Sequence, residues 1–388
     1  MTGVGYYRDL LAETPRIEAF RRAVGLTVAP GDTVLDVGCG LGTFAFFAAD
    51  AGASRVWAVD GSPIVHVASE VSRDNGYGSR VQFLRGWLPA ITLPEPADVV
   101  LFEDFPARLL DAASFRVLRS VRERYATPTA RWIPAAADLF VAPVGGAAVP
   151  SDPSGDRRYG IDWTASEEYA RHEPRVLNIA PAALLASPAR AGRVCLGEDM
   201  AAGYLGGAAE FTLTASGPIR GLAFWFDLEL ATGIRLSNAP GATPGSWGHL
   251  FLPLEEPLHG APGDTLRASV EPHSLPDGAP GWLRWEVEIA GESRRGYELA
   301  GIPASFDDLA AASPDHVPAL NDAGRLALRI LRLANGGRTI REIAEAVAGC
   351  GNGRSRAEVE RLVVETLRDR MVRPAGSWSA GEDTAHEA

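Results

Sequence analysis

The hydrophobic pattern of this 388-residue chain changes type along its length. The first unit is an apolar run at 34–37, a glycine-rich turn, a helical pattern at 43–48 and a second apolar run at 56–59. Strand, tight turn, helix and strand in this order are typical of an α/β domain. We therefore expect a doubly wound α/β domain at the start of the chain, with a further helix at about 112–125.

From about residue 190, apolar and polar residues alternate between turns rich in glycine and proline. Over 283–289, Leu, Trp, Val and Ile face one way, and Arg and Glu face the other. Alternation with a period of two is typical of an antiparallel sheet with one buried face. We expect an antiparallel β-barrel or sandwich, with other strands at 210–214, 219–230, 246–254 and 265–270.

The end of the chain returns to helical spacing. After a linker-like stretch, two capping boxes, Thr339 with Glu342 and Ser355 with Glu358, indicate where helices begin. Residues 317–376 hold eleven arginines against seven acids, although the whole chain has a net charge of −12. These features predict a separate, net basic helical module.

The glycine-rich turn carries the strongest chemical signal. Gly38, Gly40 and Gly42 follow the first strand, and Asp60 ends the second, about 20 residues on. Glycines let a backbone approach a ligand and present N–H groups at a helix N-terminus, and the acid can bind ribose hydroxyls. The unit predicts a nucleoside-bearing ligand; a glycine turn without a ligand is the alternative.

The turn departs from the dinucleotide fingerprint G-x-G-x-x-G, because Thr43 stands where the third small residue should be. With Asp36 two positions before the first glycine, it resembles motif I of the class I S-adenosylmethionine (SAM) methyltransferases, which have a Rossmann-like fold. The resemblance implies SAM as cofactor. The residues that it implies for SAM binding here are Asp36, Gly38, Cys39, Gly40, Gly42, Asp60, Gly61, Ser62, Gly86, Trp87 and Leu88.

Across residues 5–300, the order of motifs resembles the protein arginine methyltransferases. The spacing over 7–24 is similar to that family's N-terminal signature, so the resemblance implies that Tyr7 closes the pocket near the methyl group and that Arg16 pairs with the SAM carboxylate. Pro15 should separate two short helices. Without the resemblance, the segment would be a plain amphipathic lid. The family places the adenine at residues 86–88, where Trp87 is either a stacking face or a hydrophobic wall.

The stretch FEDFPARLLDAASF resembles the family's loop in which two glutamates clamp the substrate guanidinium. Glu103 matches the first glutamate and would also border the cofactor, but the second position is Ala112, and the nearest acid is Asp111. Because a planar cation favours a bidentate carboxylate pair, this departure weakens arginine relative to another cationic or amine acceptor. Asp104 adds a further carboxylate.

The stretch GSWGHLFLPLEEPL (245–258) resembles the family's T-H-W loop. Trp247 keeps the tryptophan, whose face can cover a cation, or it is a barrel-core aromatic. Gly245 and Ser246 replace the threonine and histidine, which leaves Glu13 without the family's histidine partner. A short arm at about 150–165 resembles the dimerisation arm and implies a homodimer.

Residues 320–373 resemble PqqD-like domains, small winged helices that bind the leader peptides of ribosomally made, modified peptides. A generic helical cap and a DNA-reading winged helix are the alternatives; the arginines are spread along the helices, which does not favour DNA reading. We therefore expect three domains: a SAM domain over 1–140, a β-barrel domain over 141–301 and a peptide-binding module over 317–376.

Together these patterns predict a SAM-dependent N-methyltransferase that acts on a peptide amine in ribosomal peptide biosynthesis, such as that of daptides. Its catalytic candidates are Glu103, Asp104, Asp111, Tyr7 and Trp247. The alternatives are a protein arginine N-methyltransferase and a SAM-binding regulator that contacts DNA.

Composition bears on the binding partners and the cellular compartment of the protein. The net charge of −12 argues against wholesale nucleic-acid binding. No apolar run approaches the roughly 20 residues that span a bilayer, and the N-terminus is unlike a secretory signal. Three distant cysteines predict reduced thiols, no metal site and a cytoplasmic protein.

Overall fold

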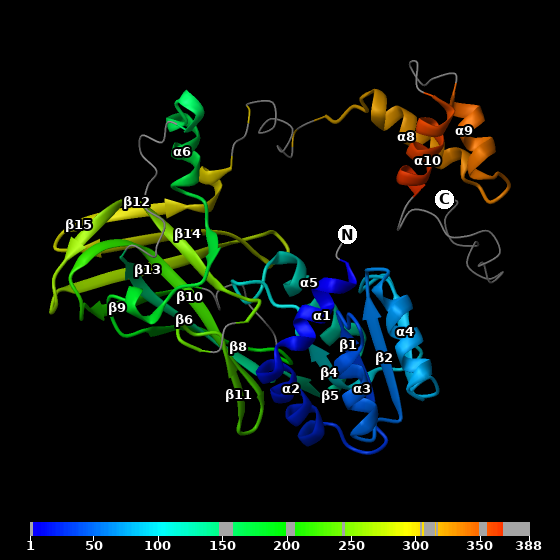
Figure 1. Ribbon diagram of the computed structural model, residues 1–388, viewed down its shortest axis with the longest axis horizontal. Helices are drawn as coiled ribbons and strands as arrows, with labels where there is room; N and C mark the ends of the chain where they lie inside the picture. The colour runs from blue at the N-terminus through cyan, green and yellow to red at the C-terminus, as the bar shows by residue number, and fades with distance from the viewer. Residues whose placement is uncertain are drawn as a thin grey trace. The chain divides into compact units, whose positions relative to one another are not determined.

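The computed structural model has two compact units, Met1–Pro303 and Ala304–Ala388, which are described separately (Figure 1). The predicted 1–140 and 141–301 domains thus lie in one unit. The structure describes residues 3–146, 158–198, 206–242, 245–302, 305, 315, 317–348 and 355–367.

The first part of the chain forms a five-stranded sheet in which every pairing is parallel. Its order is β3 (Val81–Arg85), β2 (Arg55–Asp60), β1 (Thr33–Val37), β4 (Ala97–Phe102) and β5 (Ala126–Ile133). The order reverses between β1 and β4, and ligands of such sheets bind outside the carboxyl ends of the strands at this point. The predicted glycine turn and the Glu103 loop follow these two strands.

Helices accompany this sheet (Figure 1). Pro15 lies in the first turn of α2, where its missing N–H costs no helical hydrogen bond. The helical conformation is interrupted just before it, between α1 and α2. The Phe20 ring of α2 stacks 4.6 Å from Phe44 of α3, which fastens the N-terminal helices to the domain. The helices are α1 (Val4–Ala12), α2 (Thr14–Thr27), α3 (Thr43–Asp50), α4 (Ile64–Asp74) and α5 (Ala112–Arg124).

The predicted alternation forms two antiparallel sheets, which adjoin along β8 and β9 and along β12 and β15. One contains β7 (Arg175–Leu177), β12 (His249–Gly260), β10 (Gly217–Ala231), β6 (Ala136–Gly145) and β8 (Ala189–Cys195), with β11 (Ile234–Ser237) paired to β10. The other contains β15 (Glu292–Tyr297), β14 (Pro280–Ile289), β13 (Thr265–Ser274) and β9 (Gly207–Thr212). Short helical segments are η1 (Arg158–Gly160), α6 (Thr164–Ala170), η2 (Pro181–Ala183) and η4 (Glu298–Gly301).

The chain passes from the parallel sheet to the antiparallel sheets between β5 and β6, at residues 134–135. This is a few residues before the predicted boundary at 140, because β6 already pairs with β10 from Ala136. The first half of the predicted arm at 150–165, residues 150–157, lies outside the described residues.

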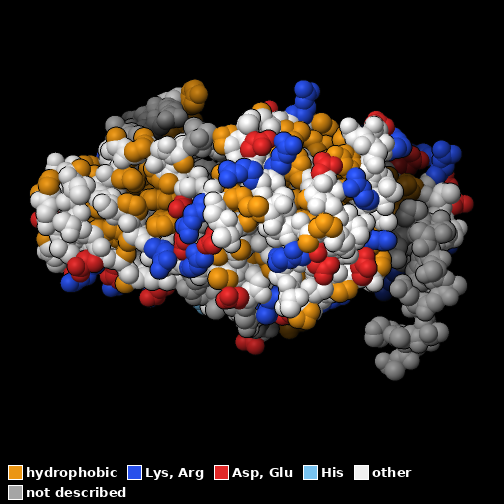
Figure 2. Space-filling view, turned by 90° about the horizontal axis from the view of Figure 1, so that it is seen from below, with side chains coloured by type: hydrophobic (Ala, Val, Ile, Leu, Met, Phe, Trp, Pro, Cys, Tyr) orange, Lys and Arg blue, Asp and Glu red, His pale blue; other side chains and the backbone are white. Residues whose placement is uncertain are grey.

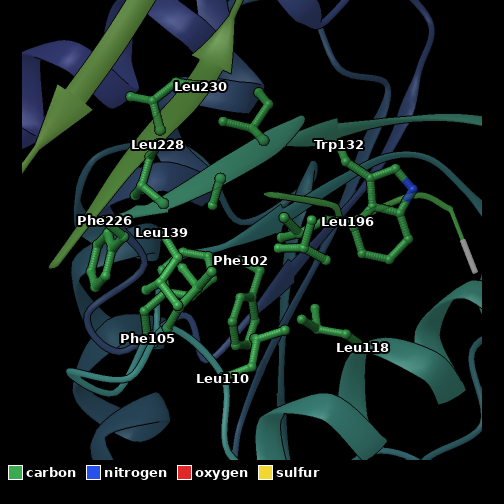
Figure 3. Close-up of a cluster of buried hydrophobic side chains, with 14 of the residues drawn as sticks. Phe102, Phe105, Leu110, Leu118, Trp132, Leu139, Leu196, Phe226, Leu228 and Leu230 are labelled. Carbon is green, nitrogen blue, oxygen red and sulfur yellow. The ribbon is translucent and has the colours of Figure 1, made fainter. Parts of the chain in front are cut away.

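One hydrophobic core runs through both kinds of sheet. Phe105, just after β4, packs edge-on against Phe102 at 4.9 Å and lies 6.0 Å from Phe226 of β10. Figure 3 shows these rings together with Leu139 of β6, whose side chain is fully buried. The two parts therefore share a core instead of meeting as separate domains.

The second unit contains α8 (Asp322–Leu333), α9 (Ile340–Ala348) and α10 (Arg356–Leu367). Both predicted capping boxes are formed: Glu342 accepts from the Thr339 N–H at 2.7 Å, and Glu358 accepts from the Ser355 N–H at 2.7 Å. Residues 317–348 and 355–367 contain no strand. The winged-helix assignment stays a prediction, and its end at 368–376 falls outside the described residues. The helices share a small core of Ile330, Ile343, Ala344, Val347, Val359 and Val363.

Phe226→Ala should lower the free energy of unfolding by about 3–5 kcal/mol, because it removes a fully buried ring from the shared core. Leu26→Ala is the control: Leu26 is 70% exposed, so the loss should stay within about 0.5 kcal/mol. Urea denaturation followed by tryptophan fluorescence measures both. Equal losses in the two variants would contradict the shared core.

Candidate active site

The candidate site lies at the carboxyl ends of β1, β2 and β4. The backbone N–H groups of Gly38 and Cys39 donate to the carbonyl of Val59 at 2.8 and 3.1 Å, so the turn after β1 is fastened to β2. Asp60 then accepts from the N–H of Gly40 at 3.0 Å and, through its other oxygen, from the N–H of Ser62 at 2.7 Å. The turn and the acid thus form one cradle.

The glycines are required by backbone geometry. Gly38, Gly40 and Gly42 have φ values of +76°, +52° and +82°, in the left-handed region that side chains disfavour. A Cβ on Gly40 would lie 3.0 Å from a ring carbon of Tyr7, and a Cβ on Gly42 would lie 2.5 Å from Phe83. Both the positive φ values and the lack of space for a Cβ therefore favour glycine at positions 40 and 42.

Asp36 lies below this cradle and is almost completely buried. Its Oδ2 has no hydrogen-bond partner among the described residues. Burial raises the pKa of Asp36 to about 7; the backbone N–H of Ala45 opposes the shift, and the charges of Asp60 and Glu103 add to it. An unpartnered buried carboxylate oxygen fits a site whose ligand brings a donor or a positive charge.

The N-terminal helices cover the cradle. The Tyr7 ring lies over Gly40, and its hydroxyl is 3.3 Å from the Ser62 hydroxyl oxygen. Burial raises the pKa of Tyr7, so it is neutral near pH 7. The predicted closure by Tyr7 thus has a geometric basis, since α1 brings its ring onto the glycine turn.

Arg16 joins the lid to the loop after β4. Its buried guanidinium donates to Glu103 Oε1 and, at 2.7 Å, to the Leu10 carbonyl, and its Nε lies 2.9 Å from Glu13 Oε2. Trp247 places its ring centroid 5.9 Å from the same guanidinium. Glu13, expected to lack the family's histidine partner, is paired with Arg16 three positions on.

The carboxylates outnumber this one guanidinium. Burial raises the pKa of Glu103 to about 7; Arg16 opposes the shift, and the charges of Asp104 and Glu13 add to it. Burial, followed by the charges of Asp60 and Asp111, also raises the pKa of Asp104. Like charges gathered at one site favour a cationic ligand, whose charge would offset their repulsion.

Asp111 lies at the N-terminus of α5. Its Oδ1 accepts from the backbone N–H of Ser114 at 2.8 Å and from the Ser114 hydroxyl at 2.9 Å, which makes it the N-cap of α5. It begins a helix by satisfying an N–H that has no partner within the helix. Asp111 thus caps α5 while its charge acts on Asp104, and its part in a carboxylate clamp with Glu103 stays a prediction.

Trp87 lies on the far side of the cradle. A Cβ on Gly61 would come within 2.1 Å of its indole ring, so Trp87 packs directly on the backbone after Asp60. About half of its surface remains exposed. Gly86 donates its N–H to the Asp60 carbonyl at 3.0 Å, and Leu88 is buried in the core. Either predicted role of Trp87, stacking face or wall, fits this position.

Trp247 reaches the site from the antiparallel part. It packs edge-on against Phe226 at 5.3 Å while facing Arg16, so both predicted descriptions, cation cover and core aromatic, apply to it.

His249, two positions after Trp247, was not predicted from the sequence to have a role at the site. Its Nδ1 accepts from the Ile179 N–H at 2.8 Å, and its Nε2 donates to the Asn238 carbonyl at 2.7 Å. Burial lowers the pKa of His249, so it acts as a neutral clip. Asn238 in turn donates to the Gly248 carbonyl at 2.7 Å, and the pair holds the segment that carries Trp247. The only sequence signal was the apolar run that surrounds this histidine.

The comparisons with known proteins agree with this geometry. The family model "Methyltransferase domain" matches residues 34–124. Protein arginine N-methyltransferase 6 of Xenopus tropicalis is 28% identical over 272 residues, covering 65% of this chain and 79% of that protein. Probable protein arginine N-methyltransferase 6 of Arabidopsis thaliana is 28% identical over 293 residues, covering 70% of this chain and 66% of that protein.

Solved structures show a similar fold. The Trypanosoma brucei PRMT1 enzyme–prozyme heterotetrameric complex with AdoHcy has a TM-score of 0.68 and 23% identity, covering 76% of this chain and 98% of that one. Arabidopsis thaliana protein arginine methyltransferase 10 has a TM-score of 0.64 and 20% identity, with the same coverage. The predicted resemblance is confirmed at this level: the chain is a SAM-dependent methyltransferase of the class I fold, similar to the protein arginine N-methyltransferases.

Proposed function

We propose that this methyltransferase modifies a nitrogen of a polypeptide and that arginine is its acceptor. The observation that carries the proposal is the Glu103 carboxylate, whose side chain is only 19% exposed and which is paired with Arg16 beside the glycine cradle and next to Asp104. The names of the similar proteins, protein arginine N-methyltransferases, support arginine over the amine favoured by the sequence analysis alone.

The residues of the cradle fit the cofactor. Glycine N–H groups and Asp60 would bind its nucleoside part, Arg16 would pair with its carboxylate, and the buried acids would balance its positive charge. When bound, SAM supplies an electrophilic methyl group on a positively charged sulfur. Tyr7 would exclude water above the cradle, since its ring already covers Gly40.

Glu103 and Asp104 would act on the acceptor. A guanidinium is always protonated in proteins, so its nitrogen must be oriented and must lose a proton as the new bond forms. A carboxylate with a pKa of about 7 can hold an N–H in place and accept that proton near neutral pH. Its negative charge also stabilises the positive charge that develops on the acceptor nitrogen.

One observation favours a second acceptor. Because Asp111 caps α5, the two-carboxylate clamp for a planar guanidinium has only Glu103 in its expected place. A terminal amine of a ribosomally made peptide, as in daptides, needs no planar clamp. Recruitment of its leader peptide by residues 317–376, a homodimer and a cytoplasmic location likewise stay predictions.

The DNA-contacting alternative gains no support from the face in Figure 2, where arginine and acidic side chains are interspersed. Nucleic-acid backbones are bound by continuous basic patches. Within the described ranges, no helix is both long enough and apolar enough to cross a bilayer.

The acceptor is tested with two peptides, incubated with the full chain and SAM. One has arginine, a blocked N-terminus and no lysine; the other has a free N-terminus and neither arginine nor lysine. Tandem mass spectrometry should place the added methyl on the arginine side chain. Methylation of the free amine alone would show that the acceptor is a terminal amine and not arginine. No transfer to either peptide, with S-adenosylhomocysteine still bound, would reject the proposed polypeptide nitrogen.

Gly40→Ala should weaken S-adenosylhomocysteine binding about tenfold or more, because the added methyl group meets Tyr7 and strains the turn. Gly76→Ala is a matched control, since Gly76 also has a positive φ, +78°, but nothing lies within 4 Å of an added Cβ. The control should bind within about twofold of the unaltered chain. Calorimetry measures both, and equal weakening would show that the cradle does not hold the ligand.

The rate should depend on the ionisation of Glu103. At saturating SAM, kcat/KM for the peptide should rise as pH increases through about 7, because the ionised fraction of Glu103 increases above that pKa. Glu103→Gln should remove this limb and lower the rate by about 10²- to 10⁴-fold. Glu123→Gln, on the exposed surface of α5, should change neither. If kcat/KM of Glu103→Gln still rose with pH through about 7, the ionising group would be another residue.

A further inference from the structure

The loop over residues 103–111, which joins β4 to α5, is anchored away from the candidate site. Phe105 packs between Phe102 and Phe226, and the side chains of Leu109 and Leu110 are fully buried. The carboxylates Glu103 and Asp104 begin this loop. Arg16 pairs with Glu103 at the near end of the loop, and the position of the two carboxylates also depends on what holds the other end.

That other end has an unfavourable backbone conformation. Leu109 has a φ of +73°, in the left-handed region, which costs about 1–2 kcal/mol for a residue with a side chain. Its N–H donates to the Pro106 carbonyl at 2.8 Å, and the N–H of Leu110 donates to the Arg108 carbonyl at 3.0 Å. Such a conformation persists only where the surroundings impose it, so the contacts of this tight turn decide the shape of the loop.

Arg108 provides the strongest of these contacts. Its Nη2 donates to Glu298 Oε1 at 2.6 Å and its Nη1 to Glu298 Oε2 at 3.4 Å, which is a two-pronged pair. The Glu298 Oε2 also accepts from the backbone N–H of Leu283 at 3.0 Å. The two side chains are only 20% and 17% exposed. Pairs shielded in this way hold geometry better than surface ion pairs, which contribute little.

We propose that Arg108 and Glu298 form a positioning pair, by which the antiparallel part sets the place of Glu103 and Asp104. Arg108 acts through the loop backbone and does not touch the reacting atoms. Its kinetic consequence rests on the proposed function, whereas its effect on the loop can be measured without any acceptor.

A neighbouring ion pair supplies the control. Arg119 of α5 donates to the Asp277 carbonyl at 2.5 Å and lies 3.4 Å from the Asp277 carboxylate, in the turn between β13 and β14. It thus crosses to the hairpin of β13 and β14, where the Gly281 carbonyl also accepts from Arg108 Nη1 at 3.5 Å, but it holds α5 and not the loop. Arg119→Met removes a crossing arginine and leaves the loop anchors in place.

Hydrogen exchange of the full chain tests the proposal directly. In Arg108→Met, the amides of Phe105, Leu109 and Leu110 should exchange about tenfold faster or more, because the tight turn loses its anchor. In Arg119→Met they should exchange at the original rate. S-adenosylhomocysteine should bind Arg108→Met within about twofold of the original affinity, since the cradle is untouched.

Measuring kcat distinguishes a positioning role of Arg108 from a role in stability alone. Arg108→Met should lower kcat about 10- to 100-fold, the cost of a displaced catalytic group, with a smaller effect in Arg108→Lys, which keeps the charge but not the fork. Glu298→Gln keeps the volume and should repeat both effects if Arg108→Met does not fold. The proposal would be overturned if the loop amides of Arg108→Met exchanged no faster than those of Arg119→Met. It would also be overturned if kcat fell no further in Arg108→Met than in Arg119→Met. If the original chain transfers no methyl group, exchange alone decides.

Discussion

The site depends on one buried charge. The guanidinium of Arg16 is shared by Glu103, Glu13 and the Leu10 carbonyl, beneath the ring of Trp247. A buried cation is stable only when it is paired, so these groups hold one another in place. They come from the N-terminal helices, the loop after β4 and the antiparallel part. One residue thus links three segments that chain continuity leaves separate.

This arrangement also explains the chemistry. Asp36, Asp60, Glu103 and Asp104 gather at the candidate site, where Glu103 is paired with Arg16, and burial raises the pKa of three of them, Asp36, Glu103 and Asp104. A site built in this way is short of positive charge. A sulfonium cofactor and a cationic acceptor would each supply one, which is why the geometry suits methyl transfer better than the binding of a negatively charged dinucleotide.

Features set by neighbours in the chain were predictable. The run that forms β1, the turn at 38–42 and the acid at the end of β2 form one local unit, and their function follows from glycine geometry. The alternation in β14 is confirmed because a period of two leaves only one way to bury Trp285 and Val287. The capping boxes at 339 and 355 are equally local.

Features set by distant partners were not predictable. Arg108 and Glu298 lie 190 positions apart, and no local pattern pairs them. Asp111 is an acid near the expected place, but a helix that begins at Ala112 takes it as a cap. The pair of Glu13 and Arg16, by contrast, is local, because a helix brings positions three apart together, and this pair was within reach of sequence reasoning. His249 is a clip only because β12 places it beside Ile179 and Asn238.

The central claim is that the cradle of residues 36–42, closed by Asp60 and faced by Arg16, holds a nucleoside with a positively charged sulfur. Calorimetric titration of the full chain with SAM, and separately with a nicotinamide dinucleotide, tests it most directly. We expect saturable binding of SAM at one site per chain and no binding of the dinucleotide. Saturable dinucleotide binding without any heat from SAM would contradict it.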